Sequence, residues 1–147
     1  STPGPTTSPR RSASSTDVRL LVDTHALLWW ATADRRLSKP ARAAIASAGE
    51  PLIGAGTMFE MAVKASVGKL ELPPDWTVEL LDRERFAILP ILPLHAHTLA
   101  TLAFVSVNGS ELRDPFDRLL VAQADAEDVP VVTRDPAIAA HGVPTIW

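Results

Sequence analysis

The sequence contains no cysteine, and it lacks several other features that would mark a functional class. Without cysteine, disulfide bonds and thiolate metal sites are excluded, and nothing indicates an oxidising compartment. No apolar run approaches the roughly 18 residues that a membrane helix needs. The formal net charge is −3, so the chain carries no broad basic footprint for nucleic acid. We expect a cytoplasmic protein, away from membranes, whose contacts with nucleic acid are local or metal-mediated.

Two kinds of ligand site are also missing. Gly54 and Gly56 fit neither the dinucleotide-binding spacing nor that of a P-loop, so we expect no nucleotide cofactor. The histidines lack a zinc-binding spacing, and His95 and His97 are only two residues apart on an expected helix. Histidine ligation of a metal is therefore disfavoured.

The length of 147 residues fits one domain. Residues 1–16 are Ser, Thr, Pro and Gly with two arginines, which predicts a disordered tail or an extension from a mis-assigned start codon. No apolar stretch follows Arg10 and Arg11, so this segment is not a secretory signal peptide. Residues 17–147 form the single domain that we expect.

That domain alternates between strand and helix signals. Apolar runs predict strands at 18–22, 51–55, 86–89, 130–133 and 143–147. Helices are expected at 25–31, 41–48, 58–67, 76–83, 95–103 and 114–126, and Asp135-Pro136 begins another. Thr57 and Glu60 resemble a capping box at the start of the third helix. The alternation predicts a three-layer α/β/α sandwich with a mostly parallel central sheet.

Acidic residues recur where this fold places ligands, at the carboxyl ends of the strands. Asp23 follows the first strand, Glu60 follows the second, Asp117 lies in the first turn of a helix, and Asp135 follows the strand at 130–133. Four carboxylates could therefore face one pocket. Taken singly, Asp114, Asp117 and Asp135 are more often helix caps than ligands. For Asp23 we favour a functional role over capping, because Thr24 could cap the next helix and a buried acid needs a partner.

Clustered carboxylates repel one another unless a cation lies between them, and Mg²⁺ or Mn²⁺ prefers such oxygen ligands. Metal held in this way promotes phosphodiester hydrolysis. Cationic side chains near the acids could contact substrate phosphates, with surface pairing as the alternative. For Lys64 that alternative is favoured, because Glu60 lies four residues before it. The other candidates are Arg113, Arg118 and Arg134.

Four segments together resemble the PIN-domain toxins of the VapC type, from type II toxin–antitoxin systems. Val22 to Trp30 resembles the opening motif of that family, and Phe59 to Lys64 followed by Gly68 to Pro73 resembles the second. Arg113 to Leu120 is similar to the third, and Val131 to Asp135 with the ending Gly142 to Trp147 fits the last. The resemblance spans nearly all of the chain after residue 17.

This resemblance implies a PIN fold, a Mg²⁺ or Mn²⁺ site, endonucleolytic cleavage of single-stranded or structured RNA, and a cognate antitoxin that blocks the site. We also expect a homodimer. By position, Asp23, Glu60 and Asp117 match the core acidic residues, with Asp135 as the more variable fourth and Asp114 as an extra acid. Thr57 matches a position usually occupied by serine, near the substrate.

The sequence departs from the family at two places. Gly54 stands where serine is frequent, which would loosen the pocket wall, and Glu111-Leu112 stands where histidine is common, which removes a polar group. We expect Trp29 and Trp30 to lie in the core or on a surface that binds a second copy or the antitoxin, and not to form a base-stacking platform. The alternatives are a degenerate PIN domain that only binds a partner, and a receiver-like Mg²⁺-binding domain. The receiver-like alternative is weak, because no lysine follows the strand at 130–133.

Overall fold

A computed structural model describes residues 18–147, so the expected tail at 1–16 lies outside the described residues. The centre is a five-stranded parallel sheet in the order β3-β2-β1-β6-β7. Its strands are β1 (Arg19–Val22), β2 (Glu50–Gly54), β3 (Ala87–Leu89), β6 (Val131–Val132) and β7 (Thr145–Ile146). The helices are α1 (Thr24–Ala31), α2 (Lys39–Ser47), α3 (Ala55–Ser66), α4 (Val78–Arg83), α5 (Pro93–Thr101), α6 (Pro115–Glu127) and α7 (Pro136–Ala140). This arrangement confirms the predicted α/β/α sandwich.

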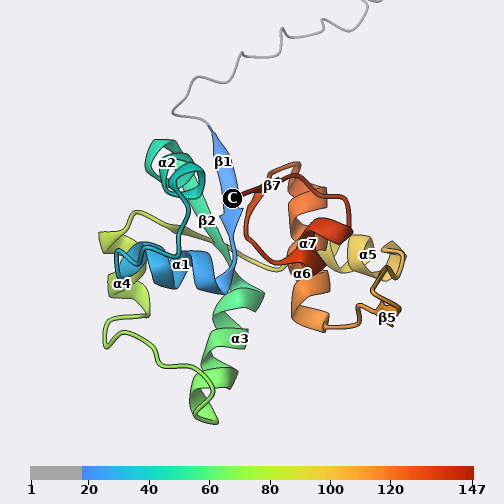
Figure 1. Cartoon of the computed structure of the whole chain (residues 1–147), viewed down its shortest axis with the longest axis horizontal. Coiled ribbons are helices and arrows are strands. Elements are labelled where there is room, and N and C mark those ends of the chain that lie inside the picture. Colours follow the sequence, from blue (N-terminus) through green and yellow to red (C-terminus); the bar gives the residue numbers. More distant parts are fainter. Residues whose placement is uncertain (1–17) are drawn as a thin grey trace, which may run out of the picture.

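Alternating side chains of the central strand β1 divide the core into two layers. Leu20 and Val22 point to one face and pack with residues of α1, α2 and α4. Leu21 points to the other face and packs with Leu120 and Val121 of α6 and with Ile138 of α7. Figure 1 shows these two groups of helices on opposite sides of the sheet. Both faces are covered, as a buried parallel sheet requires.

Several element boundaries differ from the sequence prediction. Helix α3 begins at Ala55, directly after β2, with Gly54 as a cap that has no side-chain bond. The predicted capping box at Thr57 is therefore wrong: Thr57 lies inside the helix and is buried. The predicted role of Thr24 as a cap is also wrong, because Asp23 accepts the capping bond from the Ala26 amide at 2.8 Å. A small hairpin of β4 (Ser106–Val107) and β5 (Ser110–Glu111) was not predicted.

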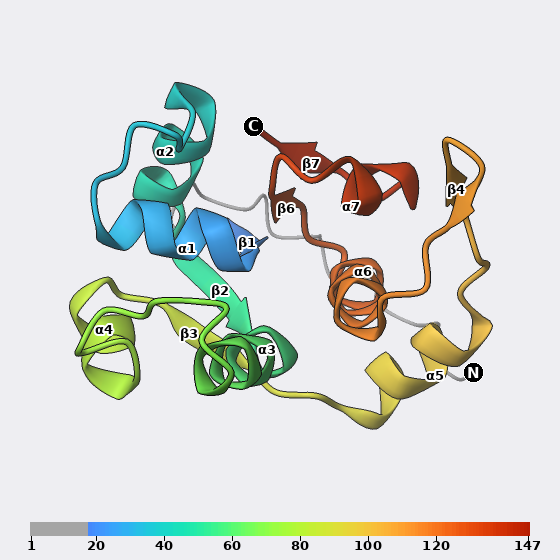
Figure 2. The ribbon, with the colours of Figure 1, turned by 60° about the horizontal axis from the view of Figure 1, so that its bottom comes forward.

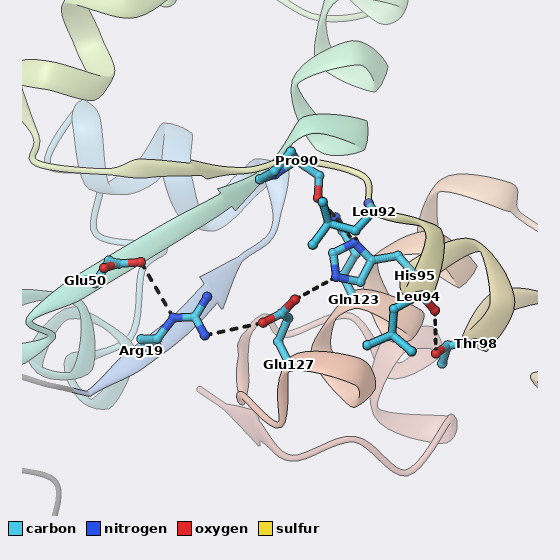
Figure 3. Close-up of polar contacts among 9 residues, drawn as sticks. All are labelled: Arg19, Glu50, Pro90, Leu92, Leu94, His95, Thr98, Gln123 and Glu127. Atoms are coloured by element: carbon cyan, nitrogen blue, oxygen red, sulfur yellow. Dashed lines mark hydrogen bonds and ion pairs between the residues drawn. The ribbon is translucent and has the colours of Figure 1, made fainter.

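A polar network ties α5 and α6 to the amino end of the sheet (Figure 3). His95 is fully buried, its Nδ1 accepts from the Leu92 amide at 3.0 Å, and its Nε2 lies 2.8 Å from Glu127. Because Nδ1 is an acceptor, Nε2 carries the proton and donates it to the carboxylate. Glu127 also pairs with Arg19 of β1, at 3.4 Å, and both contacts lower its pKa. The amino-terminal half of α6 is thereby held over the sheet end that carries the acids.

No helix within residues 18–147 combines the length and apolar character needed to cross a membrane.

Candidate active site

Five carboxylates line one pocket of about 160 Å³ at the carboxyl ends of the strands. Strand register explains the meeting point: Val22 pairs with Ile53 and with Val132, so β1, β2 and β6 end side by side. Each strand then passes directly into a turn or helix. In Figure 2, α1, α3, α6 and α7 surround this end of β1. We call this space the carboxylate pocket; its acids are Asp23, Glu60, Asp114, Asp117 and Asp135.

Asp23 is the most constrained of these acids. Its Oδ1 accepts from the Ala26 amide at 2.8 Å, and its Oδ2 accepts from the Thr133 hydroxyl at 2.5 Å. Burial nevertheless raises its pKa, although both hydrogen bonds favour the ionised form. Thr133, which is 2% exposed, also accepts from the Asp135 amide at 3.0 Å. Thr133 therefore joins two of the five acids, a role that the sequence analysis did not anticipate.

Glu60 projects from the second turn of α3 toward α1. The Thr24 hydroxyl donates to its Oε1 at 3.3 Å, and Lys64 lies 3.8 Å from the same oxygen. Burial raises the pKa of Glu60 and outweighs the opposite effect of Lys64. Lys64 lines the pocket while it forms this i,i+4 pair, so the pairing and a place at the site coexist.

Asp114 and Asp117 enter the pocket from the start of α6. The Asp114 Oδ1 accepts from the Phe116 and Asp117 amides, both at 2.9 Å, and fixes the first turn of the helix. Burial, together with the negative charges of Asp114, Asp135 and Glu60, raises the pKa of Asp117 to about 7. Asp117 is thus half protonated near neutral pH when no cation balances the cluster.

The four cations proposed from sequence end up in different surroundings. The structure contradicts the predicted contact of Arg118 with substrate. Its guanidinium is buried and donates to the Leu102 and Ala103 carbonyls at 2.9 and 3.3 Å. It ties α6 to the end of α5 and does not reach the pocket. Arg113 is exposed, pairs with Glu111 at 3.1 Å, and lies outside the described lining of the pocket. Only Lys64 lines the carboxylate pocket, and Arg134 lines an adjoining one.

Thr57 and Gly54 stand at positions where the family resemblance led us to expect serine. Thr57 lines the pocket and is buried. Gly54 does not loosen the wall: a Cβ at this position would lie 2.7 Å from Oε1 of the buried Gln123. Gln123 donates to the Pro90 carbonyl at 3.3 Å and occupies the room that a larger residue 54 would take. Trp29, 5% exposed, belongs to the core.

The fold and this acidic pocket define the class of protein. Residues 20–143 match the PIN domain, and the chain belongs to that family. The receiver-like alternative is thereby excluded.

Individual relatives extend this assignment. The chain is 31% identical over 134 residues to Ribonuclease VapC22 of Mycobacterium tuberculosis. This alignment covers 87% of the present chain and 98% of VapC22. Two solved structures share the fold. A chain of the Rickettsia felis VapBC2 complex, bound to a promoter DNA fragment, aligns with a TM-score of 0.59 at 11% identity, over 87% of this chain and 97% of that one. A chain of FitAB bound to an IR36 DNA fragment aligns at 0.57 with 21% identity, over 86% and 92%.

Proposed function

We propose that this protein is a metal-dependent endoribonuclease, the toxin of a toxin–antitoxin pair, with Mg²⁺ or Mn²⁺ as its cofactor. The observation that carries the proposal is the gathering of five carboxylates around one pocket at the carboxyl ends of the strands. The relative named as a ribonuclease supports RNA as the substrate. The structural neighbours from VapBC2 and FitAB complexes support a cognate antitoxin as partner.

The donor set fits a hard divalent cation. All five acids offer oxygen, the ligand type that Mg²⁺ and Mn²⁺ prefer, and the raised pKa values of Asp23, Glu60 and Asp117 reflect negative charge that is buried or crowded. Within residues 18–147, no three acidic or histidine side chains already stand close enough to hold an ion. Metal binding would therefore require these carboxylates to lie closer together.

Asp23, Glu60 and Asp117 would ligate the metal, with Asp114 and Asp135 acting through water or at a second ion. When bound, the metal would lower the pKa of water and balance charge on the phosphodiester oxygens. The chain's own contribution is orientation. Thr133 and the Ala26 amide hold Asp23, and Thr24 holds Glu60.

RNA cleavage tests this proposal directly. Purified protein without antitoxin is incubated with labelled single-stranded and hairpin RNAs in Mg²⁺, Mn²⁺ or EDTA. Cleavage should require metal and should vanish in Asp23→Asn and Glu60→Gln. Asp125→Asn is the matched control, because Asp125 is an exposed acid outside the pocket.

Cleavage that persists in EDTA or in both pocket variants would contradict the proposal. No cleavage by any form, across varied substrates, would instead favour the degenerate PIN domain that only binds a partner. In that case Asp23, Asp114 and Asp135 would serve only as helix caps. The inhibition by a cognate antitoxin is tested in the same assay by titrating the purified antitoxin.

A further inference from the structure

A second pocket, of about 420 Å³, adjoins the carboxylate pocket. The two share Asp23, His25 and Asp135. The remaining lining differs in character, because it includes Arg36 and Arg134 together with the indole rings of Trp29 and Trp147. We call it the arginine pocket. Its volume lies within the roughly 300 to 1,000 Å³ that is usual for small-ligand sites.

Trp29 forms the floor on which the two guanidinium groups rest. The Arg36 Cζ lies 4.9 Å from a ring centroid of Trp29, and the Arg134 Cζ lies 4.5 Å from one. Such cation–π contacts hold two like charges near each other. Arg36 is already engaged by Asp34, whose carboxylate accepts two bonds from its guanidinium at 2.8 and 3.1 Å. Trp29 itself is buried in the core, so the floor is rigid.

No group among residues 18–147 accepts a hydrogen bond from the Arg134 guanidinium, which rests on the Trp29 ring. None of the ion pairs within residues 18–147 involves Arg134, although Asp23 and Asp135 line the same pocket. A planar guanidinium is suited to bidentate contact with a phosphate. Arg134 is therefore placed to meet an anion at the border of the two pockets.

Trp147 supplies an aromatic wall. Its ring meets that of Trp29 edge-on, with centroids 5.8 Å apart and planes at 61°, and its side chain is partly exposed. His25 lies 5.4 Å from Trp29 on the same pocket. Aromatic and guanidinium planes are the surfaces on which unpaired RNA bases stack.

We infer that the arginine pocket binds the nucleotide next to the phosphodiester cleaved in the carboxylate pocket, with Arg134 on its phosphate and Trp147 against its base. The inference rests on the proposed ribonuclease function. Five carboxylates alone would repel RNA, whereas the guanidinium of Arg134 and the indole of Trp147 in the adjoining pocket give the strand favourable contacts.

Binding is measured with labelled single-stranded RNA in the Glu60→Gln background, so that cleavage does not intervene, and KM and kcat are measured without that change. The variants are Arg134→Gln, Trp147→Leu and Trp147→Phe. Arg85→Gln is the control with equal charge loss, because Arg85 is exposed and precedes β3, at the opposite end of the sheet. Thermal unfolding of each variant checks that the fold is intact.

Arg134→Gln should weaken RNA binding and raise KM by about tenfold, and it should lower the salt dependence of binding by about one phosphate contact. Trp147→Leu should weaken binding by about fivefold or more, the lower end of measured stacking effects, and Trp147→Phe should restore much of it. Arg85→Gln should leave both values unchanged. A mainly structural role of Trp147 would lower the unfolding temperature without this rescue by phenylalanine.

The outcomes separate this inference from the proposed function. If the wild-type protein cleaves RNA while Arg134→Gln and both Trp147 variants bind and cleave like Arg85→Gln, the nucleotide site is refuted and the nuclease stands. If the variants lose affinity for the antitoxin but keep that for RNA, the pocket belongs to the antitoxin and the inference is overturned. If the wild-type protein neither binds nor cleaves RNA, both fail.

Discussion

The strongest prediction about metal binding concerns Asp117, because its pKa of about 7 lies far above the ordinary value of 3.8. The raised pKa means that the metal-free native state holds a proton that the unfolded state has released. Between pH 4 and 7, raising the pH should therefore destabilise the metal-free protein. A divalent cation competes with that proton, so Mg²⁺ should stabilise the protein more strongly at pH 8 than at pH 6.

The expected size follows from binding and unfolding thermodynamics. At a Mg²⁺ concentration of about 100 times the dissociation constant at pH 8, the stabilisation is about 2.7 kcal/mol. The described 130 residues, 18–147, imply an unfolding entropy of about 0.27 kcal/mol/K, so the unfolding temperature should rise by about 10 °C. At pH 6 the proton on Asp117 weakens metal binding about tenfold, which removes about 1.4 kcal/mol and leaves a shift of about 5 °C.

Thermal unfolding followed by circular dichroism at pH 6 and pH 8, with and without Mg²⁺, measures these shifts. Asp117→Asn should remove most of the Mg²⁺ effect and its pH dependence, and it should make the metal-free protein more stable than wild type at pH 8. Asp125→Asn changes an exposed acid on the same helix and should behave like wild type. Equal Mg²⁺ shifts at the two pH values, or equal behaviour of the two variants, would refute the reasoning.

Three further predictions concern positioning and packing. Thr133→Val should lower kcat by about 10- to 100-fold, because it removes the hydroxyl that orients Asp23, whereas Thr133→Ser should retain most activity; RNA cleavage rates decide this. Gly54→Ala should destabilise the fold by about 1 to 3 kcal/mol through a clash with Gln123, and adding Gln123→Ala should recover part of that loss in urea unfolding. Glu127 has a lowered pKa, so it stabilises the fold above its unfolded pKa of about 4.5, and that contribution is lost as the pH falls. Glu127→Gln should therefore reduce the loss of unfolding free energy on acidification, measured by urea unfolding at several pH values.

The order of the elements could be predicted because local signals agreed with the fold. Apolar runs gave the strands, and Asp-Pro pairs marked the starts of α6 and α7. The start of α3 was misplaced because Gly54 caps it without a side-chain bond, and a glycine cap leaves no acceptor residue to recognise. The β4–β5 hairpin is formed by strands of two residues each, too short for an alternating pattern.

The candidate site was partly predictable. The acids are visible in sequence because they follow strands whose ends the parallel sheet aligns. The contacts of Arg118 could not be predicted from the sequence, because the direction of its side chain depends on the carbonyls that the end of α5 leaves free. Thr133 was missed for a similar reason: a threonine after a strand is common, and only the register of β1 with β6 brings its hydroxyl to Asp23.

In the structure, one acid can cap a helix and also line the pocket. Asp23, Asp114 and Asp135 each cap a helix through Oδ1, yet all three line the carboxylate pocket. A carboxylate has two oxygens, so one can satisfy backbone amides while the other faces the pocket. In Asp23 the second oxygen also accepts from the Thr133 hydroxyl, so capping and this contact together fix its direction. Asparagine caps helices about as well as aspartate, so substitution by asparagine removes the charge while it preserves the cap, and its effect on cleavage reports on the site and not on the fold.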